Sequence, residues 1–212
     1  MHIPDGFIPP SVCITGYAVA GGLTWYSLKK IQRDPNPQAN IPKASLLTAA
    51  FFVVSSIHIP LPPTSIHLIL NGMMGTLLGY YAFLAIPIGL FFQAVIFNHG
   101  GISTLGVNTI IMGVPAIAAY HLFRLRERIA LPEKIKTKIF AFLSGMLALM
   151  LSATIFSAIA ILTITPELDA TLEQRAIFIS LISYGIQGLI EGAFTFMLIS
   201  FLEQVKPELL KI

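Results

Sequence analysis

The feature that most constrains this sequence is its long apolar segments, one of which has no charged residue from Ile139 to Ile164. A segment of this length can cross the apolar core of a bilayer as a helix. Inside lipid, only helices and closed barrels satisfy every backbone hydrogen bond. Charged residues make up 11% of the chain and hydrophobic residues 55%, whereas soluble domains carry about 25% charged residues. We therefore expect an all-α, multi-pass integral membrane protein.

The apolar pattern predicts about seven transmembrane helices. The second and fourth are too short to cross a core of about 30 Å, so we expect them to pack inside the bundle or to continue as irregular segments. The whole chain is expected to form a single domain, 1–212, with a terminal segment, 1–7, before a helical bundle, 8–205. The expected helices cover about 9–28, 44–57 and 65–84, a short helix that ends near 98 after a turn at 85–87, and then 107–122, 139–164 and 176–202.

The basic residues predict the orientation of this bundle. If the amino terminus lies outside, only Arg175 among the 13 Lys and Arg residues falls on the outer side. Because Lys and Arg accumulate in cytoplasmic loops, we expect an odd number of spans, an extracytoplasmic amino terminus and a cytoplasmic carboxyl terminus. The residues on the inner side are Lys29, Lys30, Arg33, Lys43, Arg124, Arg126, Arg128, Lys134, Lys136, Lys138, Lys206 and Lys211.

The first residues of the chain form a potential metal chelate. No basic segment precedes the first apolar run, so a cleaved signal peptide is not expected and Met1 should keep its α-amine. This amine, the deprotonated amide of His2 and the ring Nδ1 of His2 can bind one ion in fused chelate rings. Such a planar nitrogen set suits Ni²⁺ or Cu²⁺, and less obviously Co²⁺ or Zn²⁺. Asp5 either accepts a hydrogen bond from a histidine ring or belongs to a plain turn before the helix.

A second imidazole could fill the open corner of this chelate. On the expected topology His58, His67 and His99 lie on the outer side with His2, and His121 lies near the inner end of its helix. A single histidine is more often structural than a metal ligand, and the residues alone leave open which of the three contributes. His99, just before the paired glycines Gly100 and Gly101, could be an extra capture group or a neutral replacement for an acidic residue.

Glu191 and two groups of small residues are the remaining features inside the apolar segments. An ionisable residue deep in a membrane helix is costly and usually paired. Glu191 could hold a metal-binding loop through hydrogen bonds, or it could be a protonated contact between helices. The glycines and alanines within 16–22 and 72–79 indicate close helix packing.

The sequence contains no G-x-x-x-x-G-K-[ST] motif and no H-E-x-x-H motif. The chain is therefore not expected to hydrolyse ATP as a P-loop protein does. If uptake of a substrate is powered by ATP, another chain must supply the ATPase.

Several segments in this order resemble the CbiM/NikM family, the substrate-binding S-components of energy-coupling-factor transporters for cobalt and nickel. The amino-terminal segment is the most specific of them, because its chemistry depends on being terminal. The resemblance also implies a second role for the small residues, as a face that docks on a coupling subunit. The segments are Met1–Phe7, Ser65–Leu68, Asn71–Gly79, Gln93–Gly101, Leu105–Asn108, Met112–Gly113 and Glu191–Gly192.

The resemblance implies a six-helix S-component fold with one helix added at the amino terminus, which lets the terminus enter the bundle. It implies that Met1, His2 and His67 hold Ni²⁺ or Co²⁺ as transported substrate, with nickel slightly favoured by the donor set and no organic cofactor. The implied partners are a membrane T-component, ATPase subunits and, in some systems, a small accessory membrane protein. The implied location is a prokaryotic cell membrane, and no nucleic acid is expected as a partner. Candidates to surround the ion are Asp5, Ser65, Asn71, His99, Asn108 and Glu191.

Two other functions are compatible with parts of this pattern. A vitamin-binding S-component would predict a larger pocket lined by aromatic residues rather than a terminal chelate. An intramembrane metal-dependent enzyme would need an open coordination position, a water molecule and a general base. A set of four nitrogens in one plane leaves no such position within that plane.

Overall fold

The computed structural model describes residues 1–57, 59–61, 64–163 and 170–210, with the side chains of 59–61, 64–66, 170–179 and 181–182 left out. The described chain is helical apart from one antiparallel hairpin in which Ile59 pairs with Ile66. The expected helical class is therefore confirmed. The elements are α1 (Pro10–Ile31), η1 (Pro37–Asn40), α2 (Ile41–Ser55), β1 (Ile59–Leu61), β2 (Thr64–Ile66), α3 (Asn71–Leu78), η2 (Gly79–Tyr81), α4 (Ala82–Phe97), α5 (Leu105–Arg124), η3 (Leu125–Arg128), α6 (Glu133–Leu162), α7 (Ala170–Val205) and η4 (Pro207–Leu210).

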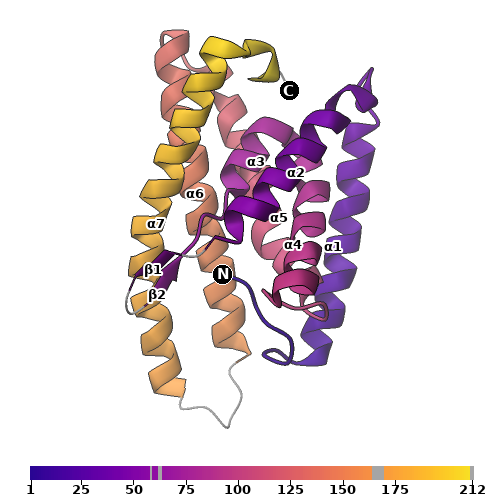
Figure 1. The fold of residues 1–212 in the computed structure, drawn as a ribbon, viewed down its shortest axis with the longest axis vertical. Coiled ribbons are helices and arrows are strands. Elements are labelled where there is room, and N and C mark those ends of the chain that lie inside the picture. Colours follow the sequence, from indigo (N-terminus) through magenta and orange to yellow (C-terminus); the bar gives the residue numbers. More distant parts are fainter. Residues whose placement is uncertain (58, 62–63, 164–169, 211–212) are drawn as a thin grey trace.

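The helix α5 lies at the centre of the bundle and packs against α1, α3, α4 and α6. The long helices α6 and α7 lie side by side along one flank, and α1 lies on the opposite flank (Figure 1). The chain before α1 turns back from the end of that helix and runs toward the middle of the bundle (Figure 1). The amino terminus is therefore part of the packed interior.

Four helical segments of the described chain are long and apolar enough to cross a membrane. Bulky apolar side chains remain exposed on them, for example Ile96 at 57% and Met197 at 65%. Exposed side chains of this kind suit contact with lipid. The expected number of seven spans and the orientation stay predictions. The four segments are Asn71–Phe97, Leu105–Arg128, Glu133–Leu162 and Ser183–Val205.

The third helix begins later than expected. Residues 67–70 are not helical, and α3 starts at Asn71 after Leu70, which has a positive φ of 58°. The following break also differs from the prediction, because Pro87 lies inside α4 and the chain turns at Gly79, with φ 58°. Glycine adopts this backbone conformation without the steric cost that other residues bear.

Close helix packing at the small residues is confirmed for α1 and α3. A Cβ added at Gly75 would lie 1.9 Å from the carbonyl oxygen of Ala116, and one added at Gly72 would lie 2.5 Å from that of Ser144. Gly16 likewise faces Val107, whereas Gly22 has nothing within 4 Å. Glycine therefore lets α3 approach the backbones of α5 and α6 directly.

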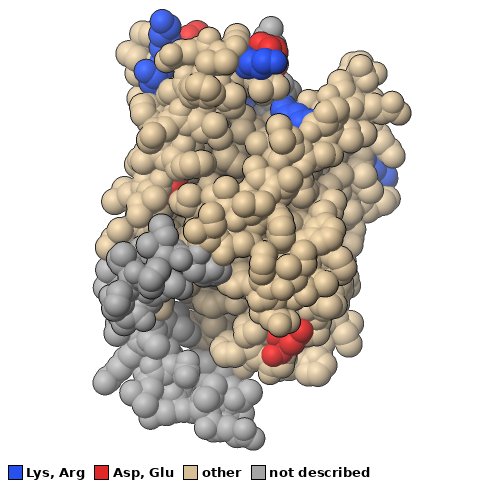
Figure 2. All heavy atoms as spheres, in the orientation of Figure 1, with Lys and Arg blue, Asp and Glu red and all other residues tan. Residues whose placement is uncertain are grey.

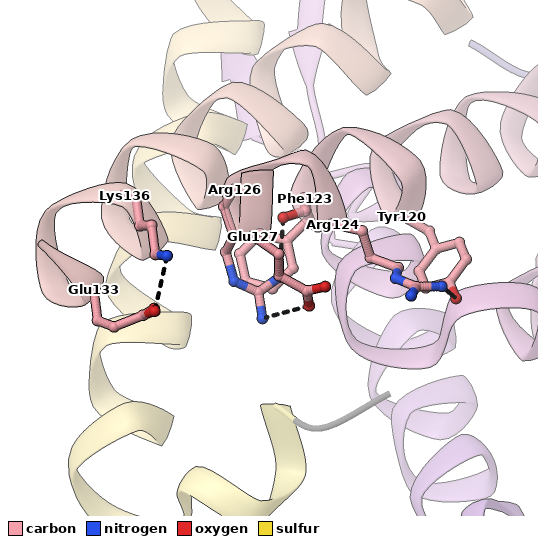
Figure 3. A network of polar contacts seen from close by, with 7 residues as sticks. All are labelled: Tyr120, Phe123, Arg124, Arg126, Glu127, Glu133 and Lys136. Carbon is pink, nitrogen blue, oxygen red and sulfur yellow. Dashed lines mark hydrogen bonds and ion pairs between the residues drawn. The ribbon is translucent and has the colours of Figure 1, made fainter. Parts of the chain in front are cut away.

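Most of the charged residues lie at one end of the molecule. Figure 2 shows Lys and Arg side chains near the end where α7 finishes, and few charges on the middle of this face. At this end Lys136 pairs with Glu133 at 2.8 Å, and Arg124 donates to the hydroxyl of Tyr120 at 2.9 Å (Figure 3). Arg126 donates to the carbonyl oxygen of Phe123 at 2.9 Å and lies 4.0 Å from Glu127 (Figure 3).

Candidate metal centre

The amino-terminal segment is bound to α5 by hydrogen bonds on both sides of Ile3. The amide of Ile3 donates to Oδ1 of Asn108 at 2.9 Å, and Nδ2 of Asn108 donates to the carbonyl oxygen of Ile3 at 3.0 Å. The hydroxyl of Thr104 donates to the same carbonyl oxygen at 2.6 Å. Ile3 is fully buried and Met1 is 7% exposed. Asn108, a predicted neighbour of the ion, therefore holds the backbone next to His2 by hydrogen bonds to Ile3.

Asp5 binds the same segment to the loop between α4 and α5. Its carboxylate accepts hydrogen bonds from the amides of Ile102, at 3.2 Å, and Ser103, at 2.9 Å, and from the hydroxyl of Ser103. The Ser103 hydroxyl, followed by these amides, lowers the pKa of the Asp5 carboxyl. A Cβ added at Gly101 would lie 2.1 Å from Oδ1 of Asp5. The hydrogen bonds described for Asp5 thus come from this loop rather than from a histidine ring.

The segment that carries His67 is held by α7. The carboxylate of Glu191 accepts the amide hydrogens of Ile69 and Leu70, the latter at 3.1 and 3.2 Å. The side chain of Gln187, one turn earlier on α7, donates to the carbonyl oxygen of His67. Glu191 therefore holds the backbone that precedes α3 through hydrogen bonds, and the prediction that this loop binds a metal ion stays a prediction. Gln187 was missed, although its spacing of four from Glu191 places both on one helix face.

The other predicted neighbours of the ion have different positions. Asn71 donates to Ser152 Oγ at 2.7 Å and to the carbonyl oxygen of Met112 at 3.3 Å, so it joins the start of α3 to α5 and α6. His58 and the side chain of Ser65 lie outside the described residues.

Three histidines meet where these segments converge. Ring nitrogens of His2, His67 and His99 lie within 4.8 Å of one another. The ring centroids are 5.7 Å apart for His2 and His67, 4.1 Å for His2 and His99, and 5.4 Å for His67 and His99. Both ring nitrogens of His2 are buried and have no hydrogen-bond partner in the described structure. Buried polar atoms are normally paired, so this ring fits a site that takes a ligand.

Burial favours the neutral forms of the Met1 α-amine and the His2 ring. It lowers the pKa of the Met1 α-amine to about 5. It also lowers the pKa of His2; the α-amine, His99 and His67 lower it further, and the nearby side chain of Gln93 raises it. Deprotonated nitrogen is the form that binds a metal ion. At neutral pH the Met1 amine and the His2 ring can therefore each offer a lone pair to an ion. The remaining histidine, His121, lies away from this centre, and its Nε2 is 3.0 Å from the hydroxyl of Tyr80.

Comparison with known proteins identifies the family of the chain. A sequence profile described as CbiM, cobalt uptake substrate-specific transmembrane region, matches residues 2–209. A Haemophilus influenzae protein provisionally named a metal transport protein is 35% identical over 148 residues, 69% of each chain. A fused nickel transport protein, NikMN, of Rhodobacter capsulatus is 37% identical over 123 residues, which are 56% of this chain and 35% of that protein.

One relative that matches nearly the whole of this chain, and one solved structure, extend the likeness to its full length. The cobalt transport protein CbiM of Geobacter sulfurreducens is 26% identical over 224 residues, 99% of this chain and 61% of that protein. The crystal structure of a truncated transition metal transporter shares the fold, with a TM-score of 0.77, 22% identity and coverage of 97% of this chain and 99% of that one. The chain therefore belongs to the CbiM family of substrate-specific transmembrane components of cobalt and nickel uptake.

Proposed function

We propose that this chain captures Ni²⁺ or Co²⁺ outside the cell in a square of four nitrogens, for uptake driven by partner subunits. The α-amine of Met1, the amide nitrogen of His2, Nδ1 of His2 and one ring nitrogen of His67 supply the corners. The observation that carries the proposal is the pair of ring nitrogens of His2, which are buried without a hydrogen-bond partner in the described structure, next to the buried Met1 and near the ring of His67. The proposal requires Met1 to carry a free amine in the cell.

The donor set supports a nickel or cobalt ion. A planar set of nitrogens suits Ni²⁺, and ionisation of the His2 amide needs a strongly Lewis-acidic ion. The names of the relatives include both cobalt and nickel transport. On the donor set alone we favour nickel slightly as the preferred substrate.

The surrounding contacts support a binding site rather than a hydrolytic site. A metal-dependent hydrolase needs a general base close to the ion. The carboxylates of Asp5 and Glu191 both accept backbone amide hydrogens in the structure. The described cluster around the candidate site consists of three histidines. Capture followed by release agrees better with this arrangement than catalysis.

Transport then requires other chains. The inner-side basic residues and the position of the amino terminus support an orientation with the metal centre toward the outside. We propose that two ATPase subunits, acting through a membrane T-component, reorient this chain so that the ion leaves on the cytoplasmic side. Some systems of this class would add a small accessory membrane subunit.

The experiment is equilibrium binding of ⁶³Ni²⁺ and ⁵⁷Co²⁺ to the purified chain in detergent. One sample keeps the native amino terminus, and a second has Gly-Ser added before Met1. We expect the extension to abolish tight binding, because it converts the α-amine into an amide and cannot fit in the buried position of Met1. A chain with the same Gly-Ser added after Ile212 is the control and should bind normally. Full affinity in the amino-terminally extended chain would overturn the proposal.

A further inference from the structure

His99 supplies a third imidazole that the proposed square does not use. Its ring lies 4.1 Å from that of His2 and 5.4 Å from that of His67, measured between centroids. The ring planes are inclined by 63° to His2 and by 87° to His67. The four corners are already taken by Met1, His2 and His67. Any contact between His99 and the same ion must therefore come from outside the plane.

The backbone fixes the position of His99 before any ion binds. At the end of α4, Asn98 has a positive φ of 50°, and the amides of Asn98 and His99 both donate to the carbonyl oxygen of Gln93, at 3.1 Å for His99. Gly100 has a φ of 83°, and a Cβ added there would lie 3.5 Å from the Cβ of His2. The loop that carries His99 therefore packs directly against the segment that carries His2.

The steep ring angles agree with an axial approach. Fused chelate rings hold the His2 ring near the plane of the square. A ligand above that plane lies at about the same distance from each corner. His99 is within reach of such a position, because its ring centroid lies 4.1 Å from that of His2 and 5.4 Å from that of His67, and its ring is tilted from both.

An axial nitrogen affects the two candidate ions differently. A low-spin d⁸ Ni²⁺ ion in a square of four nitrogens has a filled orbital along the axis and gains little from a fifth ligand. A low-spin d⁷ Co²⁺ ion has one electron in that orbital and binds a fifth nitrogen well. We infer that His99 is an axial fifth ligand that allows the site to hold Co²⁺ as well as Ni²⁺. This inference rests on the proposed function.

The test is electron paramagnetic resonance of the Co²⁺ complex, prepared without oxygen from the purified chain with its native amino terminus. In low-spin Co²⁺ the unpaired electron points along the axis, so one axial ¹⁴N nucleus splits each cobalt hyperfine line into three. We expect this splitting in the wild-type chain and its loss in His99→Ala. Added imidazole should restore it by filling the vacated position. His121→Ala, which removes a histidine far from the centre, should keep the splitting.

Binding affinities provide a second readout. We expect His99→Ala to weaken Co²⁺ binding by about 10- to 100-fold, comparable to the loss of groups that tune a metal site, and to change Ni²⁺ binding much less. A wild-type Co²⁺ signal without nitrogen splitting, or an unchanged splitting in His99→Ala, would overturn the inference. Failure of the chain to bind Co²⁺ would overturn it as well.

Two further samples keep the result interpretable. If His99→Ala does not fold, wild-type protein labelled with ¹⁵N-histidine decides the matter. Because ¹⁵N has spin 1/2, an axial labelled histidine splits each cobalt line into two instead of three. An unchanged signal contradicts an axial histidine. The chain extended before Met1 tests the square itself, so failure of the square and failure of the axial ligand give different results.

Discussion

Replacement of Asn108 by Ala should release the amino-terminal segment without altering a proposed ligand. Asn108 is the only partner described for the amide of Ile3, at 2.9 Å, whereas the carbonyl oxygen of Ile3 also accepts from Thr104. The substitution therefore leaves one buried amide unpaired, because Ile3 is fully buried. A buried unpaired group of this kind costs about 1–3 kcal/mol.

This cost sets the expected size of the effect on binding. If the ion binds only to the docked terminus, the apparent Kd rises as the docked fraction falls. A cost of about 1–3 kcal/mol corresponds to at most about a 5- to 150-fold weaker Kd, since 1.4 kcal/mol is a factor of ten. Thr104→Val is the matched control. It removes one of two donors to the Ile3 carbonyl oxygen, so its effect should be smaller.

Two measurements check this prediction on the purified chain. The first is the Kd for ⁶³Ni²⁺, and the second is the rate at which an acylating reagent modifies the Met1 α-amine in the metal-free protein. In Asn108→Ala the affinity should fall and the acylation rate should rise together. If the helix content is unchanged and both the Kd and the acylation rate match wild type, the reasoning about Asn108 is refuted.

Three other substitutions probe the supports of the site. Gly101→Ala should weaken Ni²⁺ binding, because its Cβ would lie 2.1 Å from the Asp5 carboxylate; wild-type affinity would show that the loop can move aside. Glu191→Gln should weaken Ni²⁺ binding by about 10- to 100-fold, since an amide offers one acceptor oxygen instead of two to the backbone before α3. Titration with ⁶³Ni²⁺ measures this Kd, and an unchanged Kd would contradict the assigned role. Asp5 has a lowered pKa when docked, so its stabilising effect should be complete above the usual Asp pKa of about 3.9 and disappear as the pH falls through the docked value. The protection of the Ile3 amide against hydrogen exchange should therefore fall on acidification more in the wild-type protein than in Asp5→Asn, and parallel pH profiles would exclude this contribution.

Several parts of the site could be predicted because they depend on local chemistry. The order of Met1 and His2 predicts a chelate whose atoms are adjacent in the chain, and this chelate stays a prediction. Glycine at position 75 indicated close packing, and the structure shows it against the backbone of Ala116. The family and the helical class were also accessible from sequence, because apolar length and motif order are properties of the chain itself.

Other parts could not be predicted, because they depend on contacts between distant residues. The expected third helix included residues 65–70, but the amides of Ile69 and Leu70 bind Glu191 instead of helical carbonyl groups. Apolar periodicity does not reveal this competition for backbone hydrogens. The sequence also predicts a break at Pro87. In the structure the break lies at Gly79, and Pro87 is part of α4.

The sequence by itself determined the membrane class and the family, and it predicts the chelate chemistry of the terminal nitrogens. Only the tertiary structure decided that His99 joins His2 and His67, that Asn108 holds Ile3, and that Asp5 binds a loop. The physical reason is that ligand chemistry depends on atoms close in the chain, whereas a binding site depends on backbones brought together by packing. In this protein the hydrogen bonds of Asn108 and Glu191 connect those backbones over more than 100 residues of sequence.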